Sequence, residues 1–159
     1  MGQRRSNAYP AGASSSFMAD RILVAIDDSA PAQAALGEAL RRFGAADLIA
    51  LHVLDTSESA HGVEGGAAGG WHAAKHEAAE TLLADAVAHA AEHDVDLDTA
   101  IESGPVAQTI VEYVSDHEID HVVIGSHARS GISRILIGSV AEHVMRNVPV
   151  SVTVARSSS

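Results

Sequence analysis

Short apolar runs rich in Val, Ile and Leu alternate along the chain with longer helical segments, and this alternation limits the fold more than any other feature. The runs predict five strands, at residues 21–26, 48–53, 95–101, 120–125 and 148–156. The segments between them predict four helices, at residues 29–44, 71–93, 104–117 and 138–147. Because most of the runs lack a polar face, we expect strands that are buried on both sides. The sequence therefore predicts an open α/β fold, a parallel sheet with helices on both faces.

The length of 159 residues suits one domain with a full core. Residues 1–17 are polar, small and unpatterned, and they lack the apolar segment of a secretory signal. We expect them to be a disordered N-terminal extension, with Met18 as a candidate start of the protein. The folded domain is expected at residues 18–159.

Charge and composition exclude several classes of protein. There are 21 acidic residues against 10 basic ones, the net charge is −11, and Lys75 is the only lysine. Nucleic-acid binding needs clustered Lys and Arg, so no such partner is expected. No cysteine is present and no run approaches the roughly 18 apolar residues of a membrane span, so we expect a cytoplasmic protein without membrane insertion. Acidity with almost no lysine is typical of a halophile; an acidic protein from a GC-rich genome is the alternative.

The ends of three predicted strands mark the expected position of a ligand. Open parallel sheets bind ligands at the carboxyl ends of their strands, where the strand order reverses. Asp27, Val53 and Gly125 lie at such ends. For Asp27, a capping or turn role after its strand is the alternative interpretation.

Two Gly-Ser pairs, at residues 125–126 and 138–139, describe an anion site. The second pair begins a helix, whose unpaired amides and positive dipole end attract phosphate. The first pair lets the backbone pass close to a ligand. Arg129 and Arg134 lie between the pairs. Ordinary strand-to-helix turns also use Gly and Ser, which is the alternative. The P-loop, dinucleotide and nucleophile-elbow motifs are absent from the sequence.

The same segment resembles a family signature. The residues GSHA, nine further residues and then GS are similar to the Gly-x-x-Gly-(nine residues)-Gly-Ser/Thr signature of ATP-binding universal stress proteins. The segments ILVAIDDSAPAQAAL, LHVLD, the Gly104-Pro105 helix start and GSVAEHVMRNVPVSVTVAR are similar as well, in the right order over residues 21–156. The resemblance implies a single universal stress protein domain at residues 18–159. Its fold would be a flavodoxin-like (Rossmann-like) open sheet of five parallel strands in the order 3-2-1-4-5.

The resemblance also implies an ATP site, with Mg²⁺ or Mn²⁺ on the phosphates. Asp27 would contact the ribose and Val53 would border the adenine. The phosphates would lie among Gly125, Gly138, Ser139 and the amide of Val140. The complete expected nucleotide-binding set is Ile26, Asp27, Val53, Gly125, Ser126, Ala128, Arg129, Gly138, Ser139 and Val140.

The implied function is that of a dimeric, nucleotide-binding regulator of the stress response, in which ATP stabilises a state that a partner protein reads. No side chain resembles a base poised to activate water, and His127, in a turn, is interpreted as a surface residue. We therefore expect slow ATP hydrolysis at most. A nucleotidyl-transfer enzyme is one alternative.

Ala128 departs from the signature, which has its second glycine at this position. If that glycine is needed for a left-handed backbone, alanine costs about 1–2 kcal/mol, or roughly tenfold in affinity. If a phosphate oxygen lies against its Cα, the methyl group blocks the triphosphate. ATP binding is our interpretation. An interaction protein of the same fold that has lost nucleotide binding through Ala128 is the second alternative.

Three other signals carry weaker hypotheses. His72 with His76, and His89 with His93, have the i, i+4 spacing of a chelating pair, but solvated or structural histidines are the preferred interpretation. Trp71 is expected to cap the long helix, with a cover over the adenine as the alternative.

The last predicted strand has the pattern of a sheet edge. Val150, Val152 and Val154 alternate with polar residues there, and exposed edges invite pairing. The resemblance implies antiparallel pairing of these strands across a two-fold axis. We therefore expect a homodimer; an unpaired edge in a monomer is the alternative.

Overall fold

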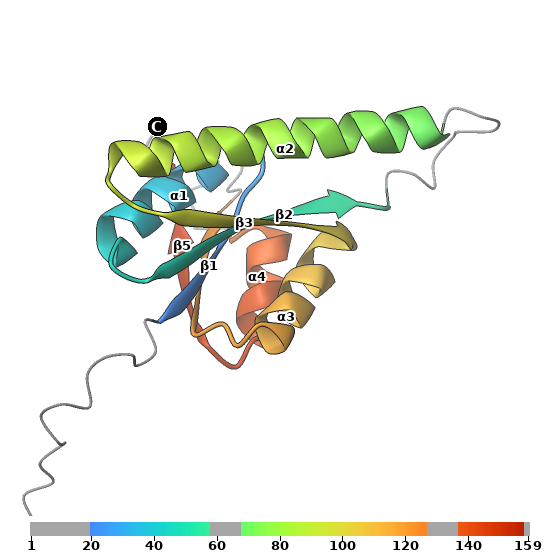
Figure 1. The fold of residues 1–159 in the computed structure, drawn as a ribbon. Coiled ribbons are helices and arrows are strands. Elements are labelled where there is room, and N and C mark those ends of the chain that lie inside the picture. Colours follow the sequence, from blue (N-terminus) through green and yellow to red (C-terminus); the bar gives the residue numbers. More distant parts are fainter. Residues whose placement is uncertain (1–19, 58–67, 127–136, 158–159) are drawn as a thin grey trace, which may run out of the picture.

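The computed structural model describes residues 20–57, 68–126 and 137–157, which fold around a single sheet (Figure 1). The strands are β1 (Arg21–Ala25), β2 (Asp47–Asp55), β3 (Leu97–Gly104), β4 (His121–Gly125) and β5 (Ser151–Ala155). The helices are α1 (Ala30–Phe43), α2 (Ala68–Glu92), α3 (Val106–Asp116) and α4 (Ser139–Asn147). In this part of the chain, no helix is both long and apolar enough to cross a membrane. The expected N-terminal extension, residues 1–17, lies outside the described residues.

The sheet is parallel and its strand order is β3-β2-β1-β4-β5, as predicted. The chain builds outward from β1 through β2 to β3, and then returns to place β4 on the other side of β1. The strand order therefore reverses between β1 and β4. At such a point the two connections leave in opposite directions and open a crevice above the carboxyl ends of the strands.

Each strand supplies side chains to two cores, because successive residues of a strand point to opposite faces. In β1, Ile22 and Val24 join the core beneath α1 and α2, whereas Leu23 and Ala25 join the core beneath α3 and α4. Figure 1 shows these helix pairs on opposite faces of the sheet. Burial on both faces explains the continuous apolar runs and confirms the predicted arrangement of the helices.

Helix α2 packs on the sheet along only part of its length. Ala79, Leu83, Ala86 and Ala90 are buried, whereas every residue from 72 to 78 is exposed. In Figure 1 the N-terminal end of α2 reaches past the tip of β2. We call residues 71–78 the α2 overhang. It lies at the carboxyl edge of the sheet.

Two boundaries around α2 differ from the predicted ones. Helix α2 begins at Ala68 rather than at residue 71, because glycines in a first turn interrupt a helix less than glycines in its interior. The expectation that Trp71 caps this helix was therefore wrong, since Trp71 lies within its first turn. Strand β3 begins at Leu97 rather than at residue 95. The amide of Val95 instead donates to the carbonyl of Ala90 at 3.0 Å and closes α2, with Asp94 in the left-handed conformation (φ 57°).

Strand β5 is an edge strand, as predicted, but it is shorter than expected. The amide of Val148 donates to the last turn of α4, so the strand begins only at Ser151 and Val150 precedes it. Val150, Val152 and Val154 are half-buried against the core beneath α3 and α4. Each of the three keeps part of its surface exposed, so their role at a dimer edge stays a prediction.

Gly125, the last residue of β4, lies against the first turn of α1. A Cβ at this position would come within 2.4 Å of the carbonyl carbon and oxygen of Pro31 and within 2.8 Å of the amide nitrogen of Ala32. These are backbone atoms, so no rotamer change relieves the clash. Ser29 is the N-cap of α1 here, and its hydroxyl accepts from the Ala32 amide at 3.3 Å. Packing of β4 on α1 thus requires glycine at residue 125 whether or not a ligand is bound.

Gly125→Ala should destabilise the fold by about 1–3 kcal/mol, because α1 must shift to admit the methyl group. Gly37→Ala is the matched control: nothing lies within 4 Å of its added Cβ. Replacing glycine inside a helix should stabilise the protein by about 0.5–1 kcal/mol. Urea denaturation measures both changes, and equal stability of the two variants would contradict the packing argument.

Candidate nucleotide site

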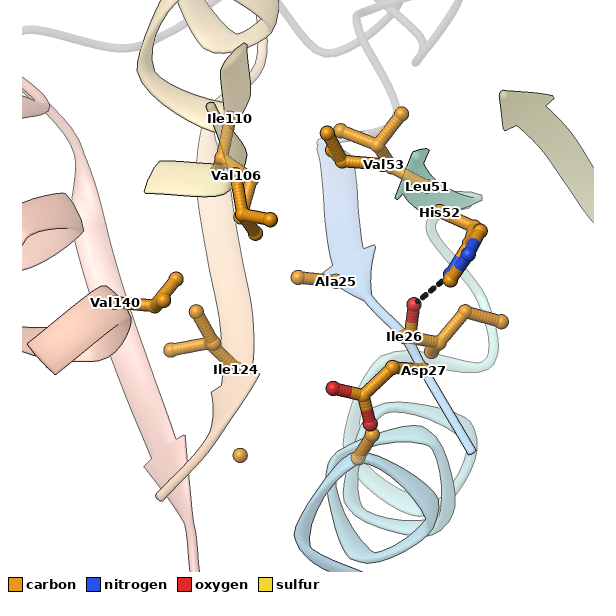
Figure 2. A pocket seen from close by; sticks show the side chains of 12 residues that line it. Ala25, Ile26, Asp27, Leu51, His52, Val53, Val106, Ile110, Ile124 and Val140 are labelled. Atoms are coloured by element: carbon orange, nitrogen blue, oxygen red, sulfur yellow. Dashed lines mark hydrogen bonds between the residues drawn. The ribbon is translucent and has the colours of Figure 1, made fainter. Parts of the chain in front are cut away.

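A pocket of about 540 Å³, counting its open mouth, lies at the point of strand reversal. Figure 2 shows side chains from β1 and β2 on one side of it and Ile124 and Val140 on the other. The lining residues are Ala25, Ile26, Asp27, Ala32, Leu51, His52, Val53, Val106, Ile110, Ile124, Gly125 and Val140. The walls are mostly aliphatic, with few polar groups at fixed positions, which is typical of a small-molecule site.

Asp27 follows β1 directly and carries the carboxylate of this pocket. One carboxylate oxygen accepts a hydrogen bond from the amide of Ser29 at 2.8 Å, which forms a tight turn before α1. In Figure 2 the carboxylate is turned toward the space between β1 and Ile124. Asp27 thus stabilises the turn, which was the alternative interpretation, and it also presents an acceptor to the pocket, so its contact with a ribose stays a prediction.

The first turn of α4 forms the opposite side of the pocket. Gly138 is the N-cap, with extended ψ (154°) and no side-chain hydrogen bond to the helix. The first intrahelical bond runs from the amide of Glu142 to the carbonyl of Gly138, at 2.9 Å. The amides before Glu142 have no partner within the helix, and Val140 among them lines the pocket. The positive end of the α4 dipole thus lies at the edge of the cavity.

The structure brings only part of the predicted site together. Ile26, Asp27, Val53, Gly125 and Val140 line one pocket, and Gly138 and Ser139 begin the helix beside it. The amide of Ser126 donates to the carbonyl of Ala155 at 2.8 Å and links the end of β4 to β5, whereas its contact with a nucleotide stays a prediction. Ala128, Arg129 and Arg134 lie outside the described residues, as does His127.

His52 is a pocket residue that the sequence analysis did not assign. Its Nδ1 lies 2.8 Å from the carbonyl oxygen of Ile26 (Figure 2). Because a carbonyl only accepts, Nδ1 carries the proton, and in the neutral ring Nε2 is an acceptor. The amide of Ile26 also donates to Leu51, so β2 holds the end of β1 through two bonds. A histidine inside an otherwise apolar strand was the signal for this role.

A second pocket, of about 870 Å³ with its open mouth, adjoins the first. The two share Asp27, His52, Val53 and Val106. The remaining lining comes from the end of β2, the end of β3 and the α2 overhang: Leu54, Asp55, Thr56, Trp71, His72, Lys75 and Ser103. Hydrogen bonds from the hydroxyl and amide of Ser57 lower the pKa of Asp55 below its ordinary value, with a smaller contribution from the positive charge of Lys75. Asp55 is therefore an ionised acceptor at neutral pH.

The two histidine pairs of α2 differ in their contacts. The rings of His89 and His93 meet edge to face, with centroids 5.1 Å apart, whereas His76 lies 3.5 Å from a carboxylate oxygen of Glu80. Over the residues that the structure describes, no three His, Asp or Glu side chains gather as a metal site.

An open parallel sheet with a pocket at its strand reversal defines a flavodoxin-like α/β protein. A model of the universal stress protein family matches residues 18–156, and the chain belongs to this family.

Individual relatives agree with this assignment. UspA of Lactobacillus plantarum is 29% identical, with a TM-score of 0.72 over 87% of this chain and 98% of its own. Universal stress protein MJ0531 of Methanocaldococcus jannaschii is 40% identical over 53 residues. The matched segment is 33% of this chain and 31% of that curated relative. A universal stress protein of Arabidopsis thaliana, solved with AMP bound, is 16% identical, with a TM-score of 0.65 over 88% of this chain and 93% of its own.

His52→Leu should destabilise the protein by about 1 kcal/mol relative to His52→Asn. Asparagine keeps a donor where Nδ1 stands and can still bond to Ile26, whereas leucine has a similar shape without a donor. Urea denaturation of the two variants measures the difference. Equal stabilities would show that this bond does not hold the end of β1.

Proposed function

We propose that this protein binds ATP in the pocket between β1 and β4 and acts as a nucleotide-dependent regulator. The nucleotide would stabilise one conformation or assembly state, and a partner protein would read that state. Hydrolysis would be slow at most.

The observation that carries the proposal is that one apolar pocket has hydrogen-bond donors at one end and an acceptor with an apolar wall at the other. At one end are the N-terminal amides of α4, which favour phosphate. The Asp27 carboxylate lies at the other end and can accept a hydrogen bond from a ribose hydroxyl. Val53 lies there as well and offers an apolar contact to a base. Phosphate, sugar and base would thus each meet a matching surface.

A nucleotide is compatible with this fold. The Arabidopsis relative was solved with AMP bound. Because it is only 16% identical to this chain, its structure supports the shared fold and not the same contacts. No cluster of metal-ligating side chains occurs among the described residues. Mg²⁺ or Mn²⁺ would therefore arrive on the phosphates rather than be held by protein carboxylates.

The net charge of −11 opposes binding of a triphosphate in dilute buffer. In molar salt the Debye length is about 3 Å, so only groups next to the phosphates matter. The composition supports a halophilic source, in which this screening would be the normal condition. Binding should therefore be measured in concentrated KCl.

Calorimetric titration of Mg·ATP into the full chain at multimolar KCl should give micromolar binding. Ala128→Gly should tighten it about tenfold, by removing the methyl group or the backbone strain at the signature position. Asp27→Asn, which keeps a carbonyl acceptor but loses the charge, should weaken it less than Asp27→Ala.

Each rival function predicts a different result. Binding only after Ala128→Gly would favour the interaction protein that has lost its nucleotide. Turnover of ATP with an added acceptor would favour a nucleotidyl-transfer enzyme, whereas recovery of unaltered ATP from the denatured complex would favour the regulator.

We further propose that two copies pair along their β5 edges. The edge position of β5 supports this, because an edge strand presents unpaired backbone groups to a second strand. Its valines are partly buried against the core beneath α3 and α4, and the surface that they keep exposed could add to the backbone contact. Antiparallel pairing of two β5 strands would satisfy a two-fold axis.

Ser151→Lys should shift a dimer toward monomer, because lysine on an edge strand opposes strand pairing. Ser115→Lys on α3 is the matched control, since both serines are exposed. Sedimentation in concentrated KCl measures the mass. A natural protein that sediments only as a monomer would refute the dimer.

A further inference from the structure

The second pocket contains the indole ring of Trp71, which does not line the pocket at the strand reversal. Trp71 lies at the start of the α2 overhang and lines this pocket together with Lys75 and His72. It is the only tryptophan in the chain. Trp71 is half-buried, although all seven residues that follow it are exposed. The indole is therefore partly shielded at the pocket and not by the core that holds the rest of α2.

Neighbouring side chains orient the indole. The ammonium of Lys75, one turn further along the helix, lies 5.3 Å from the ring centroid, in the range of a cation–π contact. The ring of His72 meets the indole edge on, with centroids 5.0 Å apart. A ring restrained in this way loses little freedom when a flat ligand stacks on it.

The position of Trp71 matches the base end of the proposed nucleotide. The second pocket shares Asp27 and Val53 with the first, and these are the residues proposed for ribose and base. Val140, in the first turn of α4, lines the first pocket and not the second. A nucleotide with its phosphates at α4 would thus extend past Val53 toward Trp71.

We propose that Trp71 stacks on the purine base of the bound nucleotide, so that the α2 overhang forms an outer wall of the site; this rests on the proposed function. Lys75 acts as a positioning residue that holds the indole in its stacking orientation. The end of β2, with Val53, forms the inner wall. The overhang, which contributes no buried core residue before Ala79, then has a role in ligand binding.

Tryptophan emission of the full chain, titrated with Mg·ATP in concentrated KCl, tests this directly because Trp71 is the only source. ATP should quench or shift the emission, whereas Mg·tripolyphosphate, which has no base, should not. By calorimetry, Trp71→Ala should weaken ATP about tenfold, the usual loss of one stacked base, and Trp71→Phe should recover most of that loss. Lys75→Met should weaken ATP less than Trp71→Ala does. His76→Ala, on the overhang but outside the pocket lining, should bind as the natural protein does.

The failure of this inference is separable from failure of the proposed function. Suppose that ATP binds with measurable heat but leaves the emission unchanged, and that Trp71→Ala binds ATP with unchanged affinity. This outcome would overturn the stacking and leave nucleotide binding intact. An affinity loss in His76→Ala equal to that in Trp71→Ala would also overturn it, because the effect would then belong to the helix as a whole. If ATP gave no heat of binding and no change in emission, both in the natural chain and in Ala128→Gly, both proposals would be overturned.

Discussion

The contact between the last residue of β4 and the first turn of α1 governs the geometry of the site. With only hydrogen on its Cα, Gly125 lets the end of β4 lie against the backbone of Pro31 and Ala32. That approach brings the end of β1, the start of α1 and the end of β4 together at the strand reversal. The first glycine of the signature is therefore explained by packing alone. A ligand need not be invoked for it, and the case for phosphate rests on the start of α4.

Polar groups in the site are few, and each also has a structural role. His52 ties β2 to the carbonyl of Ile26, and Asp27 closes the turn before α1. Residues restrained in this way present their remaining acceptors in fixed positions, so little entropy is lost when a ligand binds. In a strongly acidic protein, local donors such as the helix amides decide whether an anion is accepted, since salt screens the more distant charges.

Helix α2 combines two parts that differ in burial. Its C-terminal part is held by apolar burial, from Ala79 to Ala90, and needs no ligand. The α2 overhang has no buried residue, and it meets the second pocket through Trp71, His72 and Lys75. Its order would therefore depend on a ligand in the proposed site, because helical propensity alone stabilises a short segment weakly.

The sequence by itself determined the fold class and the position of three residues that line the candidate pocket. Apolar runs such as residues 21–26 could be recognised as strands because a strand buried on both faces is apolar throughout. Asp27, Val53 and Gly125 could be placed at one edge of the sheet because the carboxyl ends of parallel strands meet there. The start of β3 could not be predicted, since Val95 suits a strand but its amide closes α2. Only the tertiary structure decided that His52 bonds to the carbonyl of Ile26 at the end of β1, that the amide of Ser126 bonds to β5, and that Trp71 and Val53 line one pocket. These contacts join residues distant in the chain through the packing of helices on the sheet, which local periodicity does not encode.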